Sequence, residues 1–342
     1  MSMNNTRRAF LVAMVVLMGS WGAGLSWGQF LGQRSLSTDE AATLRDRAIA
    51  EVRAAAAAED AALRMNAIEA SHPVPGLASE LVEPMLLDEV APVRFAALMT
   101  VGQLKLEEHG QAAADLSLDE NLSVRAAAIF AADANGVAVD VSPLARLVHS
   151  PEPGVRGNAA LILGEMGDAS AKEMLHEAAR VPFDRRIMAI RREIVQVQVA
   201  EALVKLGDLE ALTPIRAAAY SQSDEIRVLA VSMLGPLGDR RMIPMLARML
   251  EQPPVELQLA AARSLMQLGV EDGMPILVRG LDSAMPTVRA QAAFSLGDSG
   301  DPIGLALLGD TLEDEVPMVR LAAAAAVLKR LPTAGEAQSA RR

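Results

Sequence analysis

The sequence predicts an all-α fold, a right-handed α-solenoid of about eight to nine helix pairs. A Val-Arg motif recurs along most of the chain, and two of its copies, Val288-Arg289 and Val319-Arg320, lie 31 residues apart. Hydrophobic residues make up 51% of the 342 residues but aromatic residues only 3%, which suits thin layers of closely packed helices. The repeat therefore favours one elongated domain over the two globular domains that the length alone suggests.

Residues 1–28 resemble a bacterial export signal. They contain no acidic residue, carry Arg7-Arg8 and continue into an apolar run that begins at Ala9. The stretch from Thr6 to Leu11 resembles the twin-arginine signal, and Gly28 offers a small-residue cleavage point. We therefore expect an exported, periplasmic or extracellular protein. Two alternatives stay open, an uncleaved inner-membrane anchor over residues 9–31 and a fortuitous apolar start.

Residues 29–59 are expected to form a connector followed by an N-terminal capping helix. Ser37 and Glu40 have the spacing of a capping box, which predicts a helix from Thr38 to about Glu59. This helix is rich in alanine and has apolar residues on one side. It is interpreted as the cap of the stack or as its first outer helix, and the solenoid itself is expected over residues 60–331.

The Val-Arg position marks the second helix of each pair. Its copies follow at steps of 31 residues, with one step of 40, and begin at Val93, Val124, Val155, Val195, Ile226, Leu257, Val288 and Val319. Several copies have small residues four and five places after the valine position and an aliphatic residue eight places after it. These positions share one face of a helix. Such a stripe predicts that neighbouring second helices pack closely.

A Gly-Asp dipeptide closes several of these helices, at Gly167-Asp168, Gly207-Asp208, Gly238-Asp239 and Gly300-Asp301. Glycine accepts the left-handed conformation that ends a helix, and aspartate can accept hydrogen bonds from the first amides of the next. Proline then stands near the first turn of the following helix, at Pro214, Pro244 and Pro275. Each repeat is therefore predicted to contain two helices.

Residues 60–331 resemble HEAT repeats, especially the short variety found in phycobilin lyases. The family places an aspartate before the second helix and an arginine six residues later, as in Asp88 and Arg94, Asp119 and Arg125, and Asp314 and Arg320. The other copies hold Ser150, Ile190, Ser221, Gln252 and Ser283 in the aspartate column, and Gln196 and Gln258 replace the arginine. The resemblance implies that these charges form a ladder between successive repeats, so none is proposed as a site.

One insertion of nine residues interrupts the register between Val155 and Val195, near residues 181–194. It is expected to lead into an extended helix through Ile187, Ile190, Ile194 and Val197, and it carries a dense cluster of arginines. Because insertions in solenoids often map to a binding face, we name Arg185, Arg186, Arg191 and Arg192 as candidate partner-binding residues. The alternative is a solvated basic side that pairs with nearby glutamates.

Composition argues against several kinds of function. The chain has no cysteine, and its formal net charge of -11 argues against general binding to nucleic acid. Its four histidines occupy unrelated repeat positions, and Glu173 with His176 forms a single Glu-x-x-His motif where a di-iron bundle needs two. We therefore expect no catalytic, metal-binding or cofactor-binding residue and no cofactor.

The sequence favours a non-catalytic scaffold of the bacterial cell envelope. The second helices are expected to line a concave face that binds a protein or peptide partner, with membrane association only if the N-terminal segment stays uncleaved. The alternatives are a phycobilin-lyase-like or metal-dependent HEAT-repeat enzyme and a membrane-anchored assembly factor. The small, polar residues 332–342 are expected to form a disordered tail.

Overall fold

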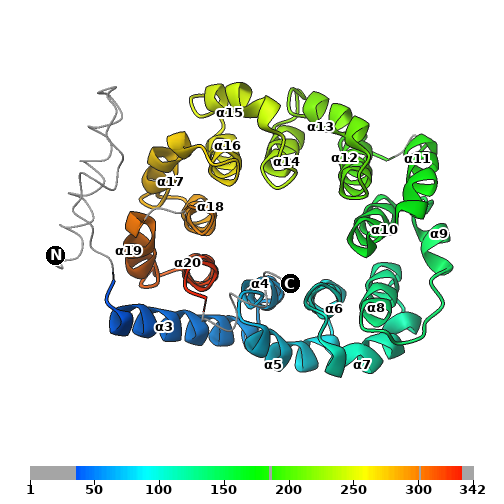
Figure 1. The fold of residues 1–342 in the computed structure, drawn as a ribbon, viewed down its shortest axis with the longest axis horizontal. Helices are drawn as coiled ribbons and strands as arrows, with labels where there is room; N and C mark the ends of the chain where they lie inside the picture. The colour runs from blue at the N-terminus through cyan, green and yellow to red at the C-terminus, as the bar shows by residue number, and fades with distance from the viewer. Residues whose placement is uncertain (1–35, 185–186, 300–301, 333–342) are drawn as a thin grey trace. The chain divides into compact units, whose positions relative to one another are not determined.

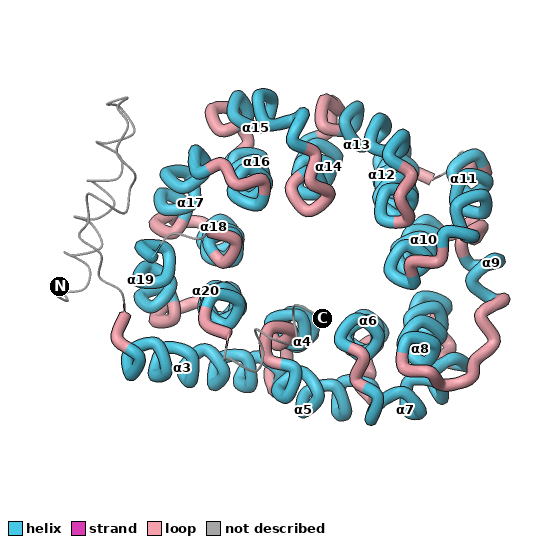
Figure 2. The backbone as a smooth tube through the Cα atoms, viewed as in Figure 1, coloured by secondary structure: helices cyan, strands magenta, loops and turns pink. Residues whose placement is uncertain are grey.

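The computed structural model describes residues 36–184, 187–299 and 302–332. Regular structure in these ranges is helical throughout, with 18 α-helices, short 3-10 turns and no strand. Short loops join the helices (Figure 2). The all-α solenoid prediction is therefore confirmed. The export segment and all but the first residue of the tail lie outside the described residues.

The chain divides into two compact units. One unit contains the chain up to Pro75 and again from Gly238 onward, and the other contains Gly76–Leu237. Both ends of the solenoid sequence therefore belong to the same unit. Each unit consists of helix pairs in two layers (Figure 1).

The unit of residues 76–237 contains the insertion. Its first-layer helices are α5 (Pro75–Leu86), α7 (Gly110–Asp115), α9 (Pro143–Leu147), α11 (Lys172–Arg180) and α13 (Leu212–Ala218). The second helices of the pairs are α6 (Ala91–Leu104), α8 (Leu122–Ala134), α10 (Pro153–Met166), α12 (Ala189–Lys205) and α14 (Asp224–Leu234). Consecutive second helices pack against each other, as the small-residue stripe predicts.

The unit that holds both chain ends places the N-terminal helices next to the last repeat. Its C-terminal pairs are α15 (Ile243–Met249) with α16 (Val255–Gln267), α17 (Met274–Gly280) with α18 (Pro286–Leu296), and α19 (Pro302–Thr311) with α20 (Pro317–Arg330). The N-terminal pair is α3 (Thr38–Ala56) and α4 (Ala61–Ala70), and both helices pack against α20. The capping helix thus covers the last repeat of the sequence.

Apolar burial and polar contacts both hold α3 on α20. The buried stripe of α3 includes Ala48 and Val52, whose exposed fractions are both 0%. Arg45 Nε donates to the Leu331 carbonyl at 3.0 Å, and Arg320 Nε lies 3.0 Å from Glu51 Oε2. Residues more than 260 positions apart in sequence therefore form one continuous core within this unit.

The predicted helix boundaries follow the local chemistry. The Ser37 hydroxyl accepts from the Glu40 amide at 3.2 Å, and the Glu40 carboxylate accepts from the Ser37 amide at 2.9 Å, so the capping box is confirmed. The helix ends at Ala56, earlier than the expected Glu59, because Asp60 already caps the next helix by accepting from Ala62.

The Gly-Asp turns at Gly167 and Gly207 have the predicted geometry, whereas at Gly238 the glycine is left-handed but Asp239 does not cap the next helix. Gly167 and Gly207 have φ angles of 72° and 88°, in the left-handed region that a side chain would strain. Asp168 Oδ1 accepts from the Ser170 amide at 2.9 Å, and Asp208 Oδ1 accepts from the Glu210 amide at 3.1 Å. The dipeptide thus ends one helix and starts the next. Gly300 and Asp301 lie outside the described residues.

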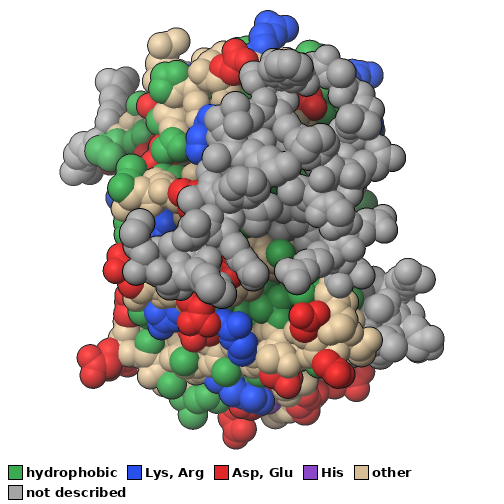
Figure 3. Space-filling view, turned by 90° about the vertical axis from the view of Figure 1, so that its left-hand side faces the viewer, with side chains coloured by type: hydrophobic (Ala, Val, Ile, Leu, Met, Phe, Trp, Pro, Cys, Tyr) green, Lys and Arg blue, Asp and Glu red, His purple; other side chains and the backbone are tan. Residues whose placement is uncertain are grey.

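Charged residues of both signs are distributed over the outer surface. In the view of Figure 3, acidic, basic and hydrophobic side chains are interspersed on the part of the face that shows described residues. Such mixing is typical of a solvated surface.

Candidate functional site

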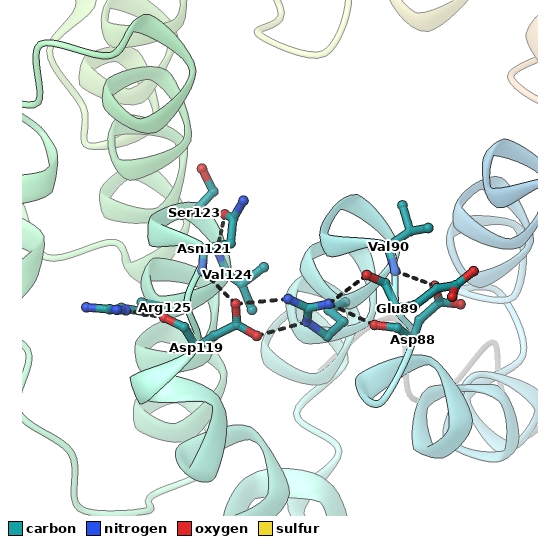
Figure 4. A network of polar contacts seen from close by, with 9 residues as sticks. Asp88, Glu89, Val90, Asp119, Asn121, Ser123, Val124 and Arg125 are labelled. Carbon is teal, nitrogen blue, oxygen red and sulfur yellow. Dashed lines mark hydrogen bonds and ion pairs between the residues drawn. The ribbon is translucent and has the colours of Figure 1, made fainter.

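The repeated arginine joins consecutive repeats through a charged hydrogen-bonded contact, here called a rung. Arg94 lies on α6. Figure 4 shows Asp88 and Glu89, in the loop before α6, opposite Asp119, in the loop before α8. The Nε and Nη2 atoms of Arg94 each lie 2.9 Å from an oxygen of the Asp119 carboxylate, and Nη1 donates to the Asp88 carbonyl at 2.8 Å. This two-point geometry is the strong form of an arginine–carboxylate contact. The ladder that the family resemblance implied is present at this position.

Two further rungs occur in the unit that holds both chain ends. Arg289 binds both oxygens of Asp314, at 2.8 and 3.0 Å. Arg320 of α20 binds Glu51 of α3, with 3.0 Å between Nε and Oε2. The N-terminal helix therefore supplies the carboxylate that a next repeat would otherwise provide.

The Asp119 carboxyl has a pKa below its usual range. Burial alone would raise this pKa, but hydrogen bonds from Arg94 and from the Asn121 amide, together with the charges of Arg94 and Arg125, more than offset that effect. The rung therefore contains an ionised carboxylate at neutral pH.

Not every arginine of the motif meets an aspartate, since Ser150 and Gln252 follow Arg125 and Arg227 in the aspartate column. Arg156 on α10 also lacks one. The next position in the aspartate column is Ile190, so no carboxylate is available there. Arg156 Nε donates instead to its own loop at the Ser150 carbonyl, at 2.9 Å, and Nη1 donates to the Val181 carbonyl at 2.8 Å. Its guanidinium carbon lies 3.7 Å from the centre of the Phe183 ring. Ser150 comes from the ordinary repeat, whereas Val181 and Phe183 come from the insertion.

Arg156 is a buried cation. Its exposed fraction is 1%, and this burial lowers the pKa of the guanidinium. Carbonyl oxygens and an aromatic face stabilise it in place of a carboxylate. The insertion therefore has a structural role that the sequence did not reveal, because it replaces the missing rung with main-chain acceptors and one ring.

A cavity of about 460 Å³ opens beside Arg156 and is called the insertion pocket. It lies between α10, the end of α11, the inserted loop and the start of α12. Its charged and polar lining is Arg156, Arg180, Arg192, Glu193 and Gln196, and its apolar lining includes Val181, Phe183, Val195 and Val199. Three arginines thus line the pocket with a single carboxylate.

The predicted arginine cluster is only partly gathered at this pocket. Arg192 lines it, whereas the adjacent Arg191 lines a separate hollow together with Met188, Ile190 and Glu225. Successive residues of a helix point in different directions, so two adjacent arginines do not share one face. Arg185 and Arg186 lie outside the described residues.

The extended helix after the insertion is shorter than predicted. The α12 helix begins at Ala189, so Ile187 lies in the preceding loop. Ile190, Ile194 and Val197 do belong to this helix. The loop is needed to bring Phe183 and the Val181 carbonyl to Arg156, which a helix starting earlier would prevent.

Sequence reasoning missed Arg156 and Phe183. The sequence showed that Arg156 cannot form the ordinary rung, because Ile190 follows it in the aspartate column, but Arg125 and Arg227 lack a following aspartate as well. No signal pointed to Phe183, since its contact depends on how the inserted loop folds back over α10.

The histidines lie apart from this pocket. His176 Nε2 lies 2.8 Å from Asp208 Oδ2, which links α11 to the following repeat. His109 Nε2 lies 2.9 Å from the Ser79 hydroxyl. The Glu108 carboxylate accepts a hydrogen bond from the same hydroxyl and does not contact Nδ1, the other ring nitrogen of His109. Among the described residues, no group of three or more His, Asp or Glu side chains could hold a metal ion.

Stacked helix pairs with arginine–carboxylate rungs define a helical-repeat protein of the α-solenoid class. A family model described as HEAT repeats matches residues 115–194, 212–286 and 249–329, and one described as a PBS lyase HEAT-like repeat matches residues 195–221. The chain therefore belongs to the HEAT-repeat family. No curated protein sequence matches it significantly.

Three solved structures resemble the chain. Human deoxyhypusine hydroxylase in complex with glycerol is 19% identical, with a TM-score of 0.36 and coverage of 84% of this chain and 97% of that one. The complex of CpcE and CpcF of phycocyanin lyase from Nostoc sp. PCC7120 is 15% identical, with a TM-score of 0.35 and coverage of 87% and 97%. YibA of Escherichia coli is 14% identical, with a TM-score of 0.34 and coverage of 85% and 97%.

Within the described ranges, no helix has both the length and the apolar character needed to cross a membrane.

Proposed function

We propose that this protein is a non-catalytic scaffold of the bacterial cell envelope that binds an acidic segment of a partner protein. The observation that carries the proposal is the insertion pocket, where three arginines line a cavity beside one glutamate. None of the ion pairs formed among the described residues involves Arg156, Arg180 or Arg192. Unpaired arginines on a chain with a net charge of -11 favour a specific acidic contact over general attraction.

The rest of the partner would contact the second helices, which the sequence predicts to line a concave face. HEAT-type stacks offer extended surfaces of this kind. Because the helix pairs are already ordered, binding loses little conformational entropy of the backbone. The apolar content of the pocket and its charge then set where the partner docks.

Charge reversal tests this proposal. Changing Arg185, Arg186, Arg191 and Arg192 together to Glu is expected to reduce capture of envelope partners at least tenfold in affinity purification with mass spectrometry, because attraction becomes repulsion at the docking site. The matched control reverses four exposed arginines elsewhere, Arg146, Arg241, Arg248 and Arg279, and changes the net charge equally. Equal capture by both variants would remove the insertion as the docking site.

Export is tested by the tryptophan content of the mature protein. Both tryptophans, Trp21 and Trp27, precede the expected cleavage point at Gly28. Protein purified from the envelope fraction is therefore expected to show no tryptophan fluorescence and an N-terminal mass starting at Gln29. Tryptophan emission that remains with the membrane after carbonate extraction would instead identify the membrane-anchored alternative.

A further inference from the structure

The insertion pocket combines free positive charge with an apolar wall. Arg180 is exposed at the end of α11, and Arg192 is half-buried in the first turn of α12. Both line the cavity, and neither forms an ion pair with a carboxylate of the described residues. Two guanidinium groups are thus available to a ligand in one hollow.

Arg156 forms the base of the pocket but has little left to offer a ligand. Its Nε and Nη1 atoms donate to carbonyl oxygens, and Phe183 lies against its face. Its fixed charge nevertheless raises the local potential, and a buried charge is poorly screened by solvent. Arg156 offsets the charge of Glu193, so Arg180 and Arg192 leave the lining of the pocket with a net positive charge.

The chain itself shows which ligand group suits these arginines. At the regular positions Arg94 and Arg289, the partner is a carboxylate that accepts two parallel hydrogen bonds. After Arg156 this column holds Ile190 instead of a carboxylate, and the insertion pocket lies beside that arginine. A carboxylate supplied from outside is the group that would restore the charge balance.

The apolar part of the pocket lining favours a ligand that carries an apolar group next to its carboxylate. Phe183, Val195 and Val199 line the same cavity as the arginines, and the two valines are buried. A volume of about 460 Å³ is in the usual range for pockets that hold a small organic group, and it exceeds what a carboxylate alone would fill. The ligand should therefore present a carboxylate on an apolar body.

We propose that the insertion pocket binds a carboxylate attached to an apolar group, with Arg180 and Arg192 holding the carboxylate and Phe183 and Val199 contacting the apolar part. This inference rests on the proposed scaffold function where the carboxylate is the C-terminus of a partner chain. A small amphiphilic acid carries the same chemistry and is the second source that the experiment must distinguish.

Calorimetric titration of the full-length protein tests the site. The probes are the dipeptide N-acetyl-Leu-Phe with a free carboxylate, its C-terminal amide, 3-phenylpropionate and inorganic phosphate. The free dipeptide acid is expected to bind at least tenfold more tightly than the amide, since only the acid can accept charged hydrogen bonds. Stronger binding of the dipeptide acid than of 3-phenylpropionate identifies a peptide C-terminus, and equal binding identifies a small acid.

Single substitutions locate the binding residues. Arg180→Gln and Arg192→Gln are each expected to weaken binding of the dipeptide acid about tenfold, which corresponds to about 1.4 kcal/mol. Arg279→Gln is the matched control, because the exposed Arg279 on α17 does not line the pocket and its substitution should leave affinity unchanged. Circular dichroism of each variant separates loss of the ligand contact from loss of the fold.

Four results would each overturn the inference: equal binding of acid and amide, binding of phosphate as tight as that of the acid, equal effects of Arg279→Gln and Arg192→Gln, or no binding of any probe at millimolar concentration. The scaffold proposal has a separate readout. If the titration shows no preference for the dipeptide acid but reversal of Arg185, Arg186, Arg191 and Arg192 still reduces partner capture, the carboxylate site fails and the scaffold proposal stands.

Discussion

Val52→Asp, a substitution in the N-terminal helix α3, is expected to destabilise the last repeat of the chain. Val52 is fully buried where α3 packs against α20, so the substitution places a carboxylate in an apolar contact without a partner. We expect the free energy of unfolding to fall by about 3–5 kcal/mol, as for other unpaired buried charges. Urea denaturation measures this loss, and hydrogen exchange should show faster exchange of the α20 amides, more than 260 residues away in sequence.

The control for this prediction is Val141→Asp. Val141 precedes α9 and is 43% exposed, so the new carboxylate stays in water and the free energy of unfolding should change by less than about 0.5 kcal/mol. Unchanged protection of α20 in the Val52→Asp variant would show that α3 is not part of the same cooperative core.

Asp119→Ala is expected to lower the free energy of unfolding nearly as much as Val52→Asp does, because it removes the rung between Arg94 and Asp119. Arg94 is only 9% exposed and would lose both carboxylate contacts, so it would remain as a buried cation without a counter-charge. We expect a loss of about 3–5 kcal/mol in the free energy of unfolding, measured by urea denaturation. The double variant with Arg94→Met should recover part of this loss, because it removes the stranded charge.

The contribution of this rung should depend on pH in a defined direction. The pKa of Asp119 is lower in the folded chain than the value of about 3.9 expected when unfolded. Its stabilisation is therefore fully present above about pH 4 and is lost as the pH falls through the lower folded pKa. The stability difference between the original chain and Asp119→Ala should shrink below about pH 4, and a constant difference would contradict the ion-pair explanation.

Glu51→Ala provides the matched comparison at the solvent-exposed rung. The Arg320 and Glu51 side chains are 27% and 30% exposed, so water can replace the lost contact. We expect a cost below about 1 kcal/mol. Arg94 makes two contacts with its carboxylate and Arg320 makes one, so the difference between the two rungs reflects both burial and the second contact.

The regular part of the fold could be predicted because its signals are local. The left-handed glycines at 167 and 207, the Ser37–Glu40 capping box and the small-residue stripe each act within one helix or one turn. The repeated spacing then places every copy of these signals in the same role. Even the ladder could be anticipated position by position, because Asp119 and Asp314 follow an arginine in the preceding repeat.

The candidate site was predictable only in outline. The broken register and the arginine cluster located the region, but adjacent arginines on a helix diverge, and the sequence could not show that Arg192 lines the pocket while Arg191 does not. Arg156 belongs to the regular motif and therefore looked structural. Its separate role follows from the loop that reaches it, and loops carry no repeating pattern from which to predict their path.

The sequence by itself determined that the chain forms helix pairs, where each pair turns and which repeats share a rung, because these features depend on residues close together or one period apart. Only the tertiary structure decided that Glu51 completes the rung of Arg320 and that Phe183 lies against Arg156. Both contacts depend on how distant or irregular segments pack, and packing selects among many partners of similar chemistry. The pairing of the first helix with the last repeat is therefore a property of the folded core, whereas the repeat itself can be read from the sequence.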